Sequence, residues 1–387
     1  MFNRRRSFTA TGALLAALAV PLLSPTWAQA SDARPSVVVL QAAQAAHAVR
    51  VQQLPHYTWR SFAKLRRAHG RPTAPPAPPA PPAPVPAPAP VSGNPLASRH
   101  LAVSAGSSAQ QEADRVRSTN PARARGLDYI AAQSTATWWG DWNPMGTVRS
   151  SVAQDEAAAH GATPIYVVYD IMQRDGAGYS AGGAANLADY RAWIDQFVAG
   201  VGSHPAAVVL EPDAVNDLYS MTGAARADRI TALRYALTTL KAHGIPAYLD
   251  AGGPSIHAPD IAAGLLTEAG VDLAQGFSVN VSNFQSTTDD VTWGKAVSAR
   301  VRGKHFVVDT GRNGNGATPA SQDAQYWCNP PGRALGHTPT ASTGDASVDA
   351  FLWIKQPGES DGQCRGFASA GTFSADYAYG LYAAMAG

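Results

Sequence analysis

Residues 207–215 read AVVLEPDAV, and this stretch decides the predicted fold. Its apolar run is typical of a buried strand, which must end at Glu211-Pro212-Asp213 because Pro212 has no N–H to donate to a sheet. The two carboxylates therefore stand at the carboxyl end of a strand, where parallel α/β folds carry their catalytic loops. Alone, the motif also fits a helix cap or an ordinary loop carboxylate, so the rest of the chain must decide.

Short β-rich runs and amphipathic helices alternate on both sides of this stretch. Apolar patterns predict strands at 165–171, 208–210, 247–249, 277–281, 306–308 and 351–354. Helical spacing of apolar residues predicts helices near 187–201, with Asn186 as N-cap, and near 230–240, 261–269 and 291–301. This alternation predicts an α/β fold with a parallel sheet, closed or nearly closed into a barrel.

Polar residues follow six of the predicted strands. They include Asp170, Arg174, Asp175, Glu211, Asp213, Asp250, Asn280, Asn283, Asp309, Arg312, Lys355, Glu359 and Asp361. Only 15% of the chain is charged, so this gathering at one edge indicates a functional cleft. Several carboxylates without metal-ligand spacing fit glycoside hydrolysis, in which one carboxylic acid protonates the leaving oxygen and another carboxylate activates water.

Tryptophan side chains near these residues would serve as flat platforms for sugar rings. The candidates are Trp138, Trp139 and Trp142, which we expect in a loop, together with Trp327 and Trp353. Trp193 and Trp293 lie on predicted helices, where core packing is the simpler interpretation.

The sequence of the first 95 residues predicts a signal peptide for export and, further on, an extended linker. Residues 1–30 resemble a signal peptide, with basic Arg4-Arg5-Arg6 and an A-x-A cleavage site at 28–30, and both the Sec and the twin-arginine routes fit. A segment of unknown role at 31–71 precedes a Pro/Ala-rich linker at 72–95, and the globular domain spans 93–387. We expect a secreted or periplasmic protein that is not membrane-bound after signal cleavage.

The charge and the cysteine content further limit the classes of partner and cofactor that we expect for this protein. The net charge is only +2 and basic residues are scattered, so we expect no nucleic-acid partner. Cys328 and Cys364 predict one disulfide in an oxidising compartment, with two unpaired thiols as the alternative. The ten histidines show no metal-binding spacing, so we expect neither metal nor cofactor, and we expect a monomer.

Several motifs, in order, resemble glycoside hydrolase family 6, the β-1,4-glucan-cleaving cellulases. They are VVYDIMQRDGAGYSAGG at 167–183, VVLEPDAV at 208–215, YLDAG at 248–252, GFSVNVSNF at 276–284, VVDTGRNGNG at 307–316, WCNPPGRALG at 327–336, STGD at 342–345 and FLWIKQPGESDG at 351–362. The resemblance covers nearly all of 93–387 and implies a distorted parallel β/α barrel and hydrolysis with inversion. No obvious long insertion would roof the cleft, so we expect an open groove and endo-type cleavage.

The resemblance also implies roles for individual residues. Asp213 matches the general acid, Asp175 the carboxylate that supports it, and Asp361 the usually proposed base, which is debated and acts directly or through a relay of waters. The substrate-binding residues that it implies are Tyr169 at the cleaved bond, Asp250 near the acid, Lys355 and Glu359 on the glycone side, and Trp138 and Trp327 as platforms, to which we add Asn280. Cys328 and Cys364 match the family's C-terminal disulfide.

The chain departs from the family pattern where water and the leaving sugar are bound. Ala181 replaces the Ser that orients the water, although the neighbouring Ser180 is a possible substitute. Gly253 and Ile256 replace a His and a stacking Trp, and Met172 and Gly176 replace a Pro and a Cys. We therefore expect an active enzyme with shifted substrate preference or weak leaving-side binding.

Two rival hypotheses come from the same residues. The losses at Ala181, Gly253 and Ile256 would also fit a non-catalytic glycan-binding protein on this fold. Residues 178–182 satisfy G-x-S-x-G, and Asp309 and His337 follow Ser180 in the order of a serine esterase, but five residues separate the strand from the first Gly of the elbow.

Overall fold

The computed structural model describes residues 93–386. The predicted signal peptide, the 31–71 segment and the linker as far as residue 92 lie outside the described residues. None of the helices in the described part of the chain is both long and apolar enough to cross a membrane.

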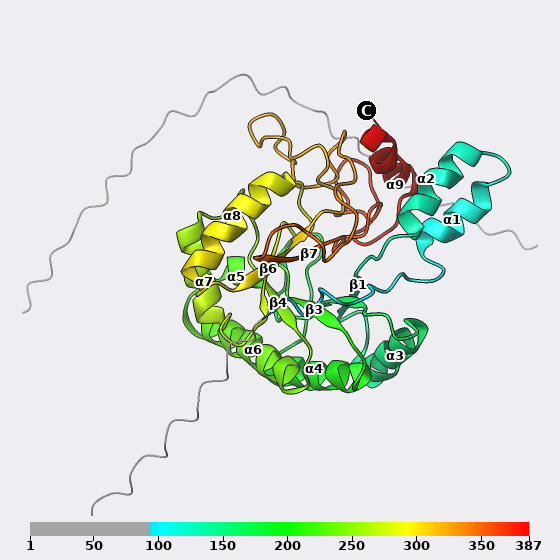
Figure 1. Cartoon of the computed structure of the whole chain (residues 1–387). Coiled ribbons are helices and arrows are strands. Elements are labelled where there is room, and N and C mark those ends of the chain that lie inside the picture. The colour runs from blue at the N-terminus through cyan, green and yellow to red at the C-terminus, as the bar shows by residue number, and fades with distance from the viewer. Residues whose placement is uncertain (1–92, 387) are drawn as a thin grey trace, which may run out of the picture. The chain divides into compact units, whose positions relative to one another are not determined.

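Seven parallel strands form one sheet in chain order (Figure 1). They are β1 (Thr137–Gly140), β2 (Ile165–Tyr169), β3 (Ala207–Leu210), β4 (Ala247–Asp250), β5 (Gly276–Val279), β6 (His305–Asp309) and β7 (Val348–Leu352). The sheet curls until its edges meet, because a parallel bridge joins Thr135 to Trp353 and the Ala136 N–H donates to the Trp353 carbonyl at 3.0 Å. The predicted distorted β/α barrel is confirmed.

Helices cover the outer face of the sheet (Figure 1). They are α3 (Met145–Ala158), α4 (Leu187–Val201), α6 (Gly223–Ala242), α7 (Pro259–Ala269) and α8 (Thr287–Arg300), so all four predicted helices are confirmed. Asn186 caps α4 as predicted, since its side chain accepts the N–H groups of Ala188 and Asp189.

Elements with weak local patterns were missed. They are strand β1, helix α3, the short α5 (Ala214–Asp217), and the group α1 (Ser108–Val116), α2 (Pro121–Ala131) and α9 (Ala375–Ala383), which is followed by a 3₁₀ turn at Ala384–Ala386. The expectation that Trp138 and Trp139 lie in a loop is wrong, because both belong to β1, which pairs with β2 along its length.

The predicted last strand also needs correction. It begins at Val348 rather than at 351, with the polar residue Asp349 inside it, and it ends before Trp353. Asp349 is buried and accepts the Tyr248 hydroxyl at 2.7 Å, so a strand position that looks unsuitable in sequence is satisfied by tertiary contact. Trp353 is fully buried between the sheet and the α1, α2 and α9 group and is not a sugar platform; Trp139 is likewise buried in the core.

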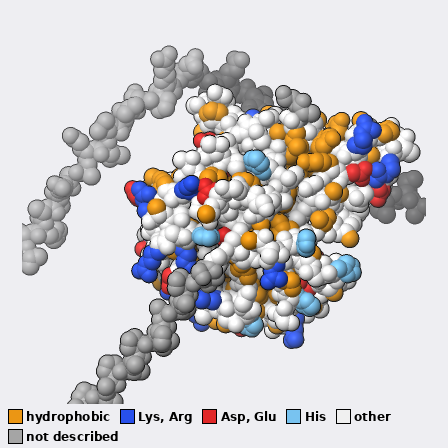
Figure 2. Space-filling view, in the orientation of Figure 1, with side chains coloured by type: hydrophobic (Ala, Val, Ile, Leu, Met, Phe, Trp, Pro, Cys, Tyr) orange, Lys and Arg blue, Asp and Glu red, His pale blue; other side chains and the backbone are white. Residues whose placement is uncertain are grey.

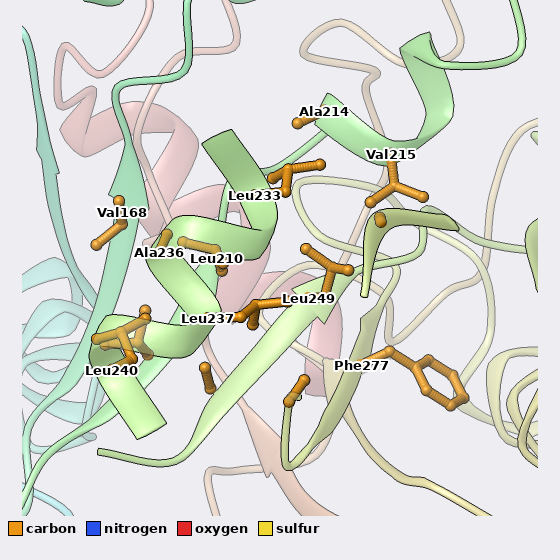
Figure 3. Packing of buried hydrophobic residues seen from close by; sticks show 14 of the residues in the cluster. Val168, Leu210, Ala214, Val215, Leu233, Ala236, Leu237, Leu240, Leu249 and Phe277 are labelled. Atoms are coloured by element: carbon orange, nitrogen blue, oxygen red, sulfur yellow. The ribbon is translucent and has the colours of Figure 1, made fainter. Parts of the chain in front are cut away.

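Strand side chains alternate between two apolar clusters. On β2, Tyr166 and Val168 face the outer helices, whereas Val167 and Tyr169 face the barrel interior. Figure 3 shows the outer cluster, in which Leu233, Leu237 and Leu240 of α6 lie near Leu210 of β3 and Leu249 of β4. Because both faces of the sheet are buried, the strands are nearly continuous apolar runs, with Ser278 of β5 and Asp349 of β7 as buried polar exceptions.

The molecular surface mixes charge types. On the face that Figure 2 shows, Lys and Arg side chains occur in small, separated groups. This distribution agrees with the small net charge of +2.

One buried carboxyl group of α8 makes stability depend on pH. Asp290 is fully buried, and neither its oxygens nor Oδ1 of Asn313 has a hydrogen-bond partner within residues 93–386. Burial, assisted by the charge of Asp309, raises the pKa of Asp290 to about 9. The native state therefore keeps a proton that the unfolded chain, with an aspartate pKa near ~4, releases at neutral pH.

Stability should consequently fall as pH rises from about 4 towards 9, by up to roughly 1.4 kcal/mol per pH unit from this group. Asp290→Asn should remove that slope and raise the free energy of unfolding at pH 8, since an amide needs no proton and offers an N–H to Asn313. Urea unfolding at pH 5, 7 and 8 measures the effect, with the exposed neighbour Asp289→Asn as control. Equal slopes in wild type and Asp290→Asn would contradict the assignment.

Candidate active site

A cleft lies at the carboxyl ends of the strands. It consists of two adjoining cavities of about 530 and 610 Å³, which share Trp138, Tyr169, Ser180, Lys355 and Ala370. The first cavity is lined by the carboxylates Asp175, Asp213 and Asp361 and by Trp327, and the second by Glu359, Trp142 and Tyr179. The structure thus brings together eight of the ten predicted catalytic and substrate-binding residues.

The turn after β3 places Asp213 in this cleft. Glu211 and Asp213 both adopt left-handed backbone conformations, with φ of 50° and 69°, which typically cost about 1–3 kcal/mol each. The Glu211 side chain is buried and accepts the N–H groups of Asp170 and Ile171, both at 3.0 Å. This carboxyl group fastens the end of β3 to the end of β2 and holds the strained turn in place.

The surroundings of Asp213 raise its pKa towards the neutral range. Desolvation at the base of the cleft, and then the charges of Asp250, Asp217 and Asp175, raise the pKa of Asp213 to about 7. The side chain is exposed to the cleft, so water screens part of the desolvation. The three carboxylates act in the same direction, and the upward shift therefore stands.

Asp250 and Asn280 lie behind the cleft surface and do not line it. Asp250 is buried at the end of β4, and its Oδ2 accepts the Asp213 N–H at 2.9 Å. Asn280 is also buried, with its amide donating to the Asp309 carbonyl at 2.9 Å and accepting from the Gln285 N–H. The expectation that these two side chains touch substrate is therefore corrected: their polar atoms are used to hold the acid and the loop after β5.

The loop after β2 is a folded hairpin around Asp175. Its Oδ2 accepts the Ser180 N–H at 2.7 Å, and backbone bonds pair Arg174 with Gly182. The buried Arg174 guanidinium donates to the Ser180 carbonyl at 2.8 Å, pairs with Asp141 at 3.0 Å, and stacks on the Tyr169 ring. Asp175 and Ser180 are thereby held at the cleft wall.

This geometry excludes the esterase hypothesis. Ser180 lies on the hairpin, well after β2 ends at Tyr169 and before α4 begins at Leu187, so it is not on a strand-to-helix elbow. The proposed partners are engaged elsewhere: Asp309 accepts backbone N–H groups, including those of Gly311 and Lys355, and the His337 ring stacks on Phe351.

The loops after β6 and β7 are tied together behind Asp361. Arg312 contacts both carboxylate oxygens of Asp361 at 2.9 Å, and the Asn329 N–H donates to the same group. The predicted disulfide between Cys328 and Cys364 is confirmed. Because Cys328 follows Trp327 and Cys364 is three residues after Asp361, the bridge joins a platform loop to a carboxylate loop.

A second group forms the opposite end of the cleft. Lys355 Nζ lies 3.4 Å from Glu359 and 5.6 Å from the ring centre of Trp138. Burial raises the pKa of Glu359, and the Lys355 charge opposes this. Trp138 is oriented by its own N–H, which donates to the Ile354 carbonyl at 2.8 Å. A cation, a carboxyl group and an indole face thus stand together, as sugar recognition requires.

Some cleft residues were not assigned from sequence. Trp142, noted only as a candidate, is 50% exposed and lines the second cavity. The half-exposed Tyr179 and Trp327 meet with ring centres 6.1 Å apart, so the loops after β2 and β6 touch beside the two cavities that they line. Of the residues at or beside the positions where the chain departs from the family pattern, Ser180 lines both cavities, Ile256 is exposed in the wall of the first cavity, and Gly253 is buried.

Within residues 93–386 no cluster of three His, Cys, Asp or Glu side chains could hold a metal ion.

Residues 97–384 match the sequence profile of Glycosyl hydrolases family 6. The chain belongs to this family. It is 40% identical over 247 residues to Endoglucanase A of Cellulomonas fimi, covering 63% of this chain and 53% of that protein. It is 42% identical over 261 residues to Endoglucanase 1 of Streptomyces sp. strain KSM-9, covering 66% of this chain and 70% of that protein.

A solved family 6 structure has the same fold. The endoglucanase Cel6 of Mycobacterium tuberculosis, in complex with methyl-cellobiosyl-4-deoxy-4-thio-β-D-cellobioside, aligns with a TM-score of 0.72 and 40% identity. The alignment covers 76% of this chain and all of that one. The chain therefore spans a complete family 6 fold but only about half the length of the Cellulomonas relative.

The raised pKa of Asp213 predicts the pH dependence of this family 6 hydrolase. If Asp213 is the general acid that the family resemblance implies, it must carry its proton, so the rate should fall as pH rises through about 7. Asp250→Asn removes one negative charge beside Asp213 and should move this alkaline limb to lower pH. Initial rates on a soluble β-glucan between pH 4 and 9 test this, with the exposed Asp228→Asn as control; an unmoved limb would contradict it.

Proposed function

We propose that this family 6 hydrolase cleaves β-1,4-glucosidic bonds inside cellulose or related β-glucan chains, with inversion at the anomeric carbon. The observation that carries the proposal is the turn that presents Asp213, with its raised pKa, to a cleft shared with Asp175 and Asp361. The relatives named as endoglucanases, and the thio-linked cellobioside bound by the mycobacterial Cel6, support a β-glucan substrate.

The proposed mechanism needs two proton transfers, one to the oxygen of the glycosidic bond and one from the water that attacks the anomeric carbon. Asp213 gives its proton to the glycosidic oxygen while that oxygen leaves the anomeric carbon. A water attacks from the opposite face and loses its proton to a carboxylate, directly or through other waters. Asp175 and Ser180 form the wall that would hold this water, because the Asp175 carboxylate fixes the Ser180 backbone and both residues line the first cavity.

Asp361 and Tyr169 complete the proposed chemistry. Asp361 is held in place by Arg312 and Asn329. We therefore propose that its carboxylate stabilises the positive charge that develops at the anomeric carbon and accepts the proton of the attacking water, directly or through other waters. Tyr169 ends β2 inside the cleft beside Trp138, with ring centres 5.4 Å apart, where it would press on the sugar at the cleaved bond. Lys355 and Glu359 would hydrogen-bond the sugar on the glycone side, with Trp138 and Trp327 as platforms.

The N-terminal sequence extends the proposal to location. The features of a signal peptide in residues 1–30 favour export, and we propose that hydrolysis takes place outside the cytoplasm. A disulfide between Cys328 and Cys364, placed beside the catalytic loops, is consistent with an oxidising compartment.

Inversion is tested on the first product. Proton NMR of a soluble β-glucan during early hydrolysis should show the α-anomer appearing first, and this signal should be absent with Asp213→Ala. An early β-anomer would mean retention and would overturn the proposed mechanism.

A glycan-binding protein without catalysis is the second candidate. The observation that favours it is the replacement of a water-orienting Ser and a stacking Trp by Ala181 and Ile256, which leaves an exposed aliphatic wall in the first cavity. Calorimetry with cello-oligosaccharides separates the two functions. Binding without any product, from folded wild type, would establish the binder and reject the hydrolase.

The contact between Tyr179 and Trp327 predicts how internal bonds are reached. If a glucan chain enters the cleft sideways past this contact, Tyr179→Ala should raise internal cleavage relative to release of reducing ends. The measurement compares the fall in viscosity of carboxymethylcellulose with reducing sugar formed, and Tyr179→Phe, which keeps the ring, is the control. If wild type releases short sugars with unchanged viscosity, the endo assignment is wrong.

A further inference from the structure

A buried arginine on α6 joins the two loops that carry Asp175 and Asp213. Arg229 is 2% exposed and contributes nothing to the lining of the cleft. Its Nη2 donates to the carbonyls of Met172 at 2.8 Å and Gln173 at 3.3 Å, which precede Asp175 in the loop after β2. Its Nη1 donates to Asp217 Oδ2 at 3.0 Å and reaches the Ala214 carbonyl, next to Asp213, at 3.4 Å.

These contacts hold two backbone segments that would otherwise be free to separate. Asp175 and Asp213 both have left-handed backbone conformations, with φ of 55° and 69°, and such conformations persist only where the surroundings enforce them. Glu211 fastens the strand ends at the base of the turn, whereas Arg229 fastens the loops beyond them. The guanidinium is thus the link between the two carboxylates on the side away from the substrate.

The chemistry of the link requires a guanidinium. Its planar fork places two N–H groups towards one loop while the other nitrogen faces the second loop, which the single ammonium of lysine does not reproduce. A buried cation also needs a charge partner, and Asp217 supplies it as a buried-to-surface ion pair whose carboxylate side is 38% exposed.

We propose that Arg229 and Asp217 are a positioning pair that sets the placement of Asp175 relative to Asp213 and keeps a negative charge beside the acid. The proposal rests on the proposed hydrolysis, but its test does not depend on activity alone. Neither residue exchanges a proton with the substrate in this account.

The charges around Asp213 agree with this role. Asp217 lies on α5, one turn after Asp213, and lines the first cavity. Its carboxylate raises the pKa of Asp213, together with Asp250 from β4 and Asp175 from the loop after β2, while Tyr169 faces the acid from β2. Arg229 from α6 pairs with Asp217.

Arg229→Lys tests the positioning of the two loops without removing the positive charge of residue 229. It keeps the positive charge but loses the fork, so kcat should fall about 10- to 100-fold, the cost of misplaced reacting groups, with KM and the pH profile close to wild type. The matched control is Arg226→Lys on the same helix: Arg226 also donates to the loop after β3, at the Leu218 carbonyl, but does not contact the loop after β2. The control should keep wild-type kcat.

Asp217→Asn tests the negative charge of residue 217 without removing its hydrogen bond to Arg229. The amide oxygen can still accept from Arg229, but the negative charge is lost, so the alkaline limb of kcat should move to lower pH by roughly half a pH unit. A purely structural role for Asp217 would leave this limb in place. The variant also provides a test if Arg229→Lys does not fold.

Two measurements apply even if the wild type does not hydrolyse glucans. Carbon NMR of the labelled Asp213 carboxyl group should show a lower pKa in Asp217→Asn. Amide hydrogen exchange should be faster at 172–175 and 213–217 in Arg229→Lys than in Arg226→Lys. Wild-type kcat in Arg229→Lys, unchanged exchange in these segments, or an unmoved Asp213 pKa in Asp217→Asn would overturn the proposal.

Discussion

The structure depends on one interaction, the buried carboxyl group of Glu211 with the N–H groups of Asp170 and Ile171. Pro212 ends the pairing of β3, and the left-handed residues on either side of it, Glu211 and Asp213, form the turn that presents Asp213. Such a turn is stable only because Glu211 replaces the sheet hydrogen bonds that the ending strands β2 and β3 can no longer make. The same contact brings the two loops that bear Asp213 and Asp175 to the same side of the barrel.

Most charged side chains around the cleft have a partner of opposite charge or a carbonyl group, and these contacts hold the loops in position. Arg174 holds the hairpin after β2, Arg312 holds Asp361, and Lys355 stands beside Glu359. Asp213 is the exception, because its neighbours Asp250, Asp217 and Asp175 are all acidic. A low-charge protein thus gathers acidic side chains around one carboxyl group that lines the cleft, and this raises the pKa of Asp213 to about 7.

The strands and the polar edge of the sheet could be predicted because they follow from local rules. Parallel strands buried on both faces must be apolar, so runs such as 165–169 are visible, and carboxylates at their ends must meet at one edge. Asn280 and Asp250 satisfy the same pattern but turn inwards, because the side chain of a strand residue alternates with register rather than with polarity. The burial of Trp139 in β1 and of Trp353 just after β7 could not be predicted either, since a buried indole and an indole at a cleft look alike in sequence.

The sequence by itself determined the β/α order, the family, the acidic turn at 211–213 and the disulfide, because periodicity, proline chemistry and motif spacing are local properties of a chain. Only the tertiary structure decided that β1 closes the sheet against the segment after β7, that Asp349 is a satisfied strand residue, and that Tyr179 meets Trp327. It also decided that Arg229 of helix α6 is buried and reaches two loops far apart in sequence. These outcomes depend on which distant backbone groups fold against one another, and no local pattern encodes that distance.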